Sequence, residues 1–345
     1  LTPVVGEMGQ QTPSSSELTN GVQLWASNFS REGYGFAGWA DSTTYNGVKY
    51  GPNETITAPD DISTNGYSLY VIWIKSAGNM QNWTGCSNLS QGEVTALKDS
   101  RDNDVYAVAK LADGKCWMIE NLRLENTGID NTNGSLAQGY NSSFIGLADP
   151  EPADFIDSTT ANSLYSIDGS TDATISGDYQ DHRFPRYNNS NTNSRQSSSG
   201  YSPTRNTYSY GNYYTWHAAI ADTTHYYSGD HNTTSICPAG WHIPTGIATT
   251  GEFALLDIAL GGTGSRSFSP VLSNRYRSYP NNFLYSGFFD EYADYRSYYG
   301  IYWSSTAYSS DRAYEMSLYN LYDGVYIGEW NYKYRGRSIR CMIDS

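Results

Sequence analysis

Tyrosine side chains dominate the C-terminal part of the chain, and their chemistry is that of non-covalent recognition. Fifteen of the 32 tyrosines lie between Asn274 and Cys341, where Ser, Asn, Asp and Gly separate them. A buried tyrosine needs a partner for its hydroxyl group, so most of these rings are expected at the surface. Tyrosine offers a large contact area, and short polar residues add adaptable hydrogen bonds. The mixture predicts a ligand-binding surface; the alternative is a tyrosine-rich β-domain that is merely polar outside.

Candidate ligand-binding residues share two properties: they are tyrosine, serine, aspartate or arginine, and they lie between expected framework positions. They are Tyr292, Asp294, Tyr295, Tyr298, Tyr299, Tyr308, Ser310, Asp311, Ser317, Tyr319, Tyr322, Asp323, Tyr326, Tyr332, Tyr334 and Arg335.

The framework that must hold these side chains is expected to consist of strands. Residues 302–306 are typical of a strand that enters a turn, and residues 338–343 alternate between polar and apolar types. In residues 314–319, alternation places Tyr314, Met316 and Leu318 toward the core. Ser317 and Tyr319 are then expected on the side that faces a ligand.

No set of residues predicts catalysis or metal binding. The five histidines, in order His182, His217, His225, His231 and His242, show neither H-E-x-x-H nor another metal-ligand spacing. We find no nucleophile with a base and an orienting group, so we expect no enzyme activity, no cofactor and no metal.

A possible calcium site at Asp99, Asp102 and Asp104 is incomplete. The segment lacks the Gly and the distal Glu of a twelve-residue calcium loop. A hydrogen-bonded turn is the expected role of these aspartates.

The four cysteines, Cys86, Cys116, Cys237 and Cys341, are widely spaced and contain no C-x-x-C pair, which argues against a zinc or dithiol redox site. Of the three possible pairings we favour Cys86 with Cys116 and Cys237 with Cys341, each worth about 2–4 kcal/mol. Free thiols in a reducing compartment are the alternative.

Composition limits the class of partner. The net charge is -14, and the 21 Lys and Arg residues form no basic run, so nucleic acid is not an expected partner. No apolar run approaches the roughly 18 residues of a membrane-spanning helix, so we expect no membrane insertion. The low content of charged residues and the spaced cysteines favour an extracellular protein; a leader or anchor is expected outside this sequence.

The rest of the chain divides into short strands and polar connections. Strands are expected at residues 22–25, 33–40 and 68–73, and a hairpin with the turn Asp113-Gly114 at residues 105–122. Residues 126–210 are expected to form long irregular loops. A short helix is expected at 210–221, and residues 251–262 carry the clearest helical pattern, ended by glycine.

The N-terminal part resembles the Listeria-Bacteroides repeat, a β-grasp-like module of bacterial surface proteins. Its pattern G-Y-x-F-x-G-W matches residues 33–39, and its closing L-Y-x-x-W matches residues 69–73. The resemblance implies a stalk module over residues 1–77. Residues 1 to about 18 have the composition of a linker, and Gly6-Glu7-Met8 resembles the end of the turn that follows the first strand of the module.

The remainder, about 86–343, resembles the Fibrobacter succinogenes major paralogous domain. The shared elements occur in order at residues 99–102, 116–122, 211–216, 237–245, 302–306 and 338–341. That family is similar to the formylglycine-generating-enzyme branch of the C-type lectin fold. The resemblance implies an α+β, C-type-lectin-like domain over residues 78–345, with long irregular loops.

Residues 274–341 further resemble the variable region of proteins that retroelements diversify. Adenine-directed mutagenesis yields residues such as Tyr, Ser, Asp, Asn, Gly, Arg and Ile, but not Lys, Glu, Gln, Met or Trp. The unreachable types here are expected to be framework or differently coded: Glu315, Met316, Glu329, Trp330 and Lys333.

We therefore expect a receptor or adhesin that binds a protein or glycan on another cell or surface. A fixed-specificity lectin is the nearer alternative, although the E-P-N or Q-P-D calcium signature is absent. An enzyme of the formylglycine-generating type is the more distant one, because Cys237 and Cys341 lie in framework motifs.

Overall fold

The computed structural model describes residues 3–11, 21–24, 29, 31–57, 67–101, 103–123, 166–167, 210–211, 213–214, 216–220, 235–290, 292–294, 298–309, 311–320, 324–333 and 335–344. In these ranges the chain has a mixed α+β structure in which antiparallel sheets predominate and the helices are short. Among the described residues, no helix has the length and apolar character needed to cross a membrane.

The described part of residues 1–77, which we call the N-terminal module, contains a sheet in the order β1-β5-β3 and a separate pair of short strands. The strands are β1 (Val4–Gln11), β2 (Val22–Gln23), β3 (Tyr34–Ala40), β4 (Thr55–Ile56) and β5 (Tyr67–Lys75). Its core is aromatic because Phe36 meets Trp39 and Trp73 edge to face.

The expectation of a linker and a turn at the N-terminus is wrong for residues 4–11. This segment is β1, which pairs antiparallel with β5 and shifts register between Val5 and Met8. Gly6 permits the shift, because a Cβ atom there would overlap the Trp73 indole.

The described part of residues 78–345, which we call the C-terminal domain, begins with two single 3-10 turns and a four-stranded sheet in the order β17-β8-β7-β6. The elements are η1 (Met80–Asn82), η2 (Gly85–Asn88), β6 (Val94–Lys98), β7 (Val105–Lys110), β8 (Cys116–Met118) and β17 (Met342–Ile343). The β7–β8 hairpin confirms the predicted turn at Asp113-Gly114, where Gly114 has φ +80. The last strand reaches this sheet from the far end of the chain.

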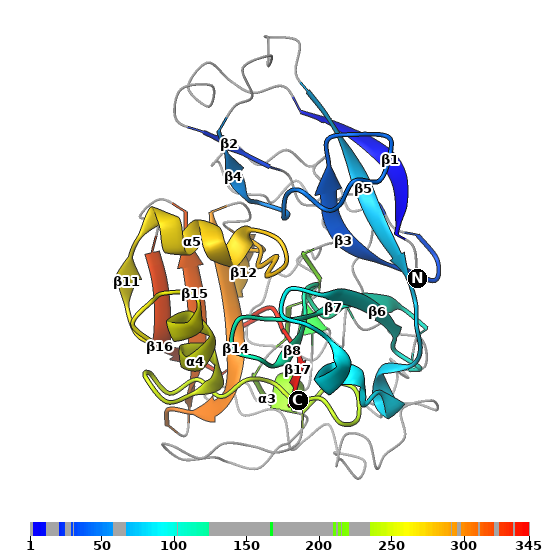
Figure 1. The fold of residues 1–345 in the computed structure, drawn as a ribbon. Helices are drawn as coiled ribbons and strands as arrows, with labels where there is room; N and C mark the ends of the chain where they lie inside the picture. The colour runs from blue at the N-terminus through cyan, green and yellow to red at the C-terminus, as the bar shows by residue number, and fades with distance from the viewer. Residues whose placement is uncertain are drawn as a thin grey trace.

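A second four-stranded sheet, in the order β11-β16-β15-β14, carries most of the tyrosine-rich segment. Its strands are β11 (Ser267–Phe268), β14 (Tyr299–Ala307), β15 (Arg312–Tyr319) and β16 (Gly324–Tyr332), and the hairpin β12 (Phe288–Asp290)–β13 (Tyr292–Asp294) lies beside them. Helices α4 (Glu252–Ala259) and α5 (Pro270–Arg277) lie across one face, in front of the sheet in Figure 1. That face is core, because Met316, Leu318 and Ile327 pack with the helices.

Local sequence explains where α5 begins and where α4 ends. The Ser269 hydroxyl accepts a hydrogen bond from Leu272 N at 3.2 Å, and Pro270 occupies the first turn of α5. The predicted helix at 251–262 is confirmed as α4, which Gly261 (φ +91) ends. The shorter helix is α3 (Trp216–Ile220), and it follows β10 (Tyr213–Tyr214), which pairs with β9 (Ser166–Ile167). The rest of the loop region expected at 126–210 lies outside the described residues, apart from Tyr210.

Two disulfides and buried tryptophans hold the domain together. Cys86 is bonded to Cys116 and Cys237 to Cys341, which confirms the favoured pairings. Trp303 is fully buried and donates its indole N–H to Tyr214 O at 2.9 Å. Trp241 donates to Met80 O at 3.1 Å. These contacts join segments that are distant in sequence.

Candidate ligand-binding surface

The register of β14, β15 and β16 divides the predicted ligand-binding residues between two faces of the sheet. Residues that lie opposite each other in an antiparallel pair share a face, and Tyr319 lies opposite Tyr299. On β15, Arg312 and Tyr314 differ from Tyr319 by an odd number of positions, so they point to the other face. The expectation of a single ligand-facing side is therefore wrong.

A bulge at Gly328 produces the same division on β16. Ile327 lies opposite Met316 and Glu329 lies opposite Glu315, so Gly328 is the extra residue of β16. In a regular strand without a bulge, Tyr326 and Trp330 are four positions apart and would share a face. Gly328 has φ +80, and a Cβ atom there would be 2.9 Å from the Ala248 Cβ. The position therefore requires glycine.

The first group forms a continuous row of rings, which we call the aromatic ladder. Each strand contributes one ring, and neighbouring rings meet edge to face. In order the members are Phe268, Tyr326, Tyr319, Tyr299 and Phe288, with centroid separations of 5.5, 4.6, 5.0 and 6.0 Å. Arg266 lies over the Tyr326 ring at 4.3 Å. These phenol rings pack against one another, contrary to the expectation that they stand apart in solvent.

Burial differs sharply along the ladder. Phe268 is 64% exposed, whereas Tyr326 is 5% exposed. Burial raises the pKa of the Tyr319 hydroxyl to about 12. Ser317, on the same face, is fully buried, which corrects its assignment to an outward position. Only the Phe268 end of the ladder offers a large exposed ring.

The second group lies at the opposite end of the sheet and on the opposite face. We call it the Trp330 patch, and its members are Tyr308, Asp311, Arg312, Trp330, Tyr332 and Arg335. Trp330 is 41% exposed and stacks on Tyr308 with ring centroids 4.9 Å apart and planes at 11°. The Arg312 guanidinium lies 4.3 Å from the Trp330 ring and 4.8 Å from the Tyr332 ring.

Hydrogen bonds fix the charged groups of the patch. Arg312 Nη2 donates to the Tyr332 hydroxyl at 3.1 Å, and Arg312 Nε lies 3.8 Å from Asp311 Oδ2. Arg335 Nη1 donates to Asn331 Oδ1 at 2.8 Å, and its guanidinium lies over Tyr332 at 5.6 Å. The patch therefore combines half-exposed rings with charged groups in set positions.

Several predicted residues cannot be placed on either face. Tyr295, Ser310, Tyr322, Asp323 and Tyr334 lie outside the described residues. Tyr292 and Asp294 belong to β13, whose backbone alone is described. Tyr298 precedes β14, and its carbonyl oxygen accepts a hydrogen bond from Asn320 N at 2.8 Å.

The expected framework residues are buried, with two exceptions. Glu315, Met316 and Lys333 are buried, but Trp330 and Glu329 are not. The sequence did not predict Trp330 as a surface residue. It was assigned to the framework because adenine-directed mutagenesis does not produce tryptophan. Phe268 was missed because it precedes the tyrosine-rich segment.

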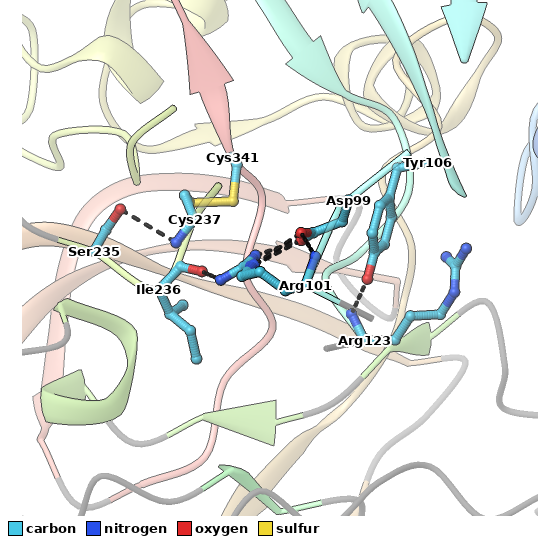
Figure 2. The surroundings of a disulfide bond; sticks show 8 residues. All are labelled: Asp99, Arg101, Tyr106, Arg123, Ser235, Ile236, Cys237 and Cys341. Carbon is cyan, nitrogen blue, oxygen red and sulfur yellow. Dashed lines mark hydrogen bonds and ion pairs between the residues drawn. A yellow bond between two sulfur atoms is a disulfide. The ribbon is translucent and has the colours of Figure 1, made fainter. Parts of the chain in front are cut away.

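The aspartate turn at residues 99–104 is structural. Asp99 is fully buried and accepts hydrogen bonds from Arg101 and from Gln81 Nε2 at 2.7 Å. Arg101 Nη1 donates to Ile236 O at 2.6 Å, beside the Cys237–Cys341 disulfide (Figure 2). Asp102 lies outside the described residues.

His242 and Glu252 form a titratable pair in which each shifts the pKa of the other. His242 Nε2 lies 2.9 Å from Glu252 Oε1, and Glu252 Oε2 accepts a hydrogen bond from Thr245 N at 2.8 Å. Burial acts to lower the pKa of His242, but the hydrogen bond and charge of Glu252 outweigh it and raise that pKa. In the described ranges, no group of three or more His, Cys, Asp or Glu side chains is arranged to hold a metal ion.

No family model, curated protein or solved structure matches this sequence.

Proposed function

We propose that this protein is displayed at a cell surface and binds a protein or glycan ligand through the Trp330 patch. The observation that carries the proposal is Trp330, a 41% exposed indole stacked on Tyr308 with Arg312 over its ring. A few hot-spot residues carry most of the binding energy of protein interfaces, and tryptophan, tyrosine and arginine are enriched among them.

Pre-organisation gives the patch a physical advantage in binding. Ordering a flexible side chain at an interface costs about 0.5–1.5 kcal/mol. Here the rings stack on each other, and Arg312 is held by Tyr332 before any ligand arrives. Little further entropy is lost on binding.

Diversification of this surface by a retroelement is part of the proposal. Tyr308, Asp311, Tyr332 and Arg335 are types that adenine-directed mutagenesis produces, whereas Trp330 is not. A constant tryptophan among variable neighbours would supply affinity while they set specificity. Sequencing the neighbouring DNA tests this: a reverse-transcriptase gene and an adenine-rich near-copy of the segment are expected, and their absence contradicts it.

The proposed fold of residues 78–345 is C-type-lectin-like. Its support is the mixed α+β arrangement and the disulfide that ties the segment before Trp241 to the chain end. The two disulfides are also compatible with an extracellular location.

A fixed-specificity lectin is the second candidate, because one observation favours it. The Asp311 carboxylate is partly exposed close to the half-exposed rings of the patch. Rings can pack on sugar faces while a carboxylate accepts hydrogen bonds from sugar hydroxyl groups.

One experiment tests the site and separates the two ligand classes. Wild-type protein, Trp330→Ala and Phe268→Ala are applied to arrays of surface proteins and of glycans, with and without a calcium chelator. Loss of a hot-spot residue weakens binding by about 2 kcal/mol or more, roughly thirtyfold, so Trp330→Ala is expected to lose most signal. Phe268→Ala removes an exposed ring on the opposite face and is expected to retain it. The reverse pattern moves the site to the aromatic ladder and refutes the patch.

A further inference from the structure

Side chains of the C-terminal domain bind the N-terminal module largely through main-chain atoms of the module. Asn274 exchanges two hydrogen bonds with Thr55: Thr55 N donates to Asn274 Oδ1 at 2.8 Å, and Asn274 Nδ2 donates to Thr55 O at 3.0 Å. Asn282 Nδ2 donates to Ala37 O at 3.0 Å. An amide side chain can satisfy a main-chain N–H and C=O together, as another strand would.

Charged side chains complete this recognition. Glu120 Oε2 accepts hydrogen bonds from Phe36 N at 3.3 Å and from Ala107 N at 2.6 Å, which joins β3 to β7. Arg277 Nη1 donates to Asn53 O. Glu120 and Arg277 are almost fully buried, and unpaired buried charges are strongly destabilising, so these contacts belong to a stable interface.

Close backbone approach sets the geometry of the interface. A Cβ atom on Gly51 would collide with the carbonyl oxygen of Arg277, and one on Gly35 would be 2.6 Å from Ala107 N. Asn53 has φ 57, and its Oδ1 accepts a hydrogen bond from Tyr285 N at 3.0 Å. The interface therefore specifies the path of the module backbone.

We infer that this surface of the C-terminal domain is a docking site for the backbone of a β-module, with Asn274 and Asn282 as its main determinants. Docking makes the module a fixed part of the binding unit, whereas the resemblance implied only a stalk module. Such recognition tolerates different side chains at module positions that make no side-chain contact with the C-terminal domain, provided that glycine occupies positions 35 and 51.

Docking also fixes one end of the sheet β11-β16-β15-β14. Asn320, which follows β15, donates from Nδ2 to Gln23 Oε1 of the module at 2.8 Å. The contact helps to fix the orientation of this sheet relative to the module.

Hydrogen exchange of the full chain, read by mass spectrometry on peptides of the module, tests the inference without a ligand. Asn274→Ala removes two main-chain hydrogen bonds and is expected to reduce protection around Thr55 by a factor of about 5–30. Thr55→Val keeps the main chain and removes only the hydroxyl contact to Arg277, so a much smaller change is expected. Asn88→Ala, at an exposed site away from the module, is the control and should change nothing there.

Two results would overturn the inference. One is a Thr55→Val effect as large as that of Asn274→Ala, since recognition would then depend on side chains. The other is a dimer in sedimentation that Asn274→Ala dissociates, since the docked module would then come from a second copy. Ligand arrays report on the Trp330 patch separately, so failure of either proposal leaves the other intact.

Discussion

Glu315 Oε2 accepts a hydrogen bond from Arg337 Nε at 2.8 Å, and both side chains are almost completely buried. Arg337 also lies over Phe288 of the aromatic ladder at 5.0 Å. Glu315 Oε1 accepts from Asn331 Nδ2 at 3.4 Å, and Asn331 accepts from Arg335 of the Trp330 patch. This buried ion pair therefore lies between the two groups: it contacts the aromatic ladder directly and reaches the Trp330 patch through Asn331.

Removal of one partner of this pair should be strongly destabilising. Glu315→Ala leaves Arg337 buried without its carboxylate, so we expect a loss of about 3–5 kcal/mol in the free energy of unfolding. Urea unfolding measures the loss. Glu329 forms a half-exposed ion pair with Arg266, in which Glu329 Oε1 lies 3.9 Å from Arg266 Nε. Glu329→Ala is therefore the control and should change stability by less than about 1 kcal/mol. Equal losses would contradict the role given to burial.

Framework tryptophans and patch tyrosines should differ in their effect on stability. Trp303→Ala and Trp241→Ala each empty a buried site and should cost about 3–5 kcal/mol. Tyr308→Ser removes a half-buried ring. The stacking of this ring on Trp330 contributes about 0.5–1.5 kcal/mol, so a smaller loss of stability is expected. Thermal unfolding of the three variants compares them, and similar losses would refute the division into framework and surface.

Tyrosines of the aromatic ladder should be energetically coupled. The Tyr319 and Tyr326 rings have centroids 4.6 Å apart, so a double-mutant cycle with alanine should give about 0.5–1.5 kcal/mol of interaction energy. The surface positions expected from the sequence predict that these two tyrosines act independently on stability. Full additivity in the cycle would restore that prediction.

Stability should depend on pH through His242 and Glu252. The pKa of His242 is raised from 6.5, so its contribution is complete below pH 6.5 and disappears as pH rises through the folded-state pKa. For Glu252, burial opposes the shift, but His242 and Thr245 lower its pKa from 4.5. Its contribution is complete above pH 4.5 and is lost on acidification. His242→Gln should therefore destabilise most between pH 4.5 and 6.5, as urea midpoints at several pH values would show; a pH-independent loss would contradict this.

Local signals in the sequence were sufficient for much of the framework. The hairpin at Asp113-Gly114, the helix that ends at Gly261 and both disulfide pairings follow from turn chemistry, helical spacing and cysteine positions. The hairpin and the helix depend on contacts within a short segment, and four cysteines allow only three pairings. The core side of β15 also followed in part, since Met316 and Leu318 are buried.

Tertiary structure alone decided which side chains lie together. Alternation places Tyr326 and Trp330 on one face, but the Gly328 bulge, packed against Ala248, puts them on opposite faces. The Asn274–Thr55 contact joins residues 219 positions apart, and no local pattern marks it. Sequence therefore determined the residue types available for binding, whereas register shifts and long-range packing determined the surfaces, because both depend on contacts that no short segment contains.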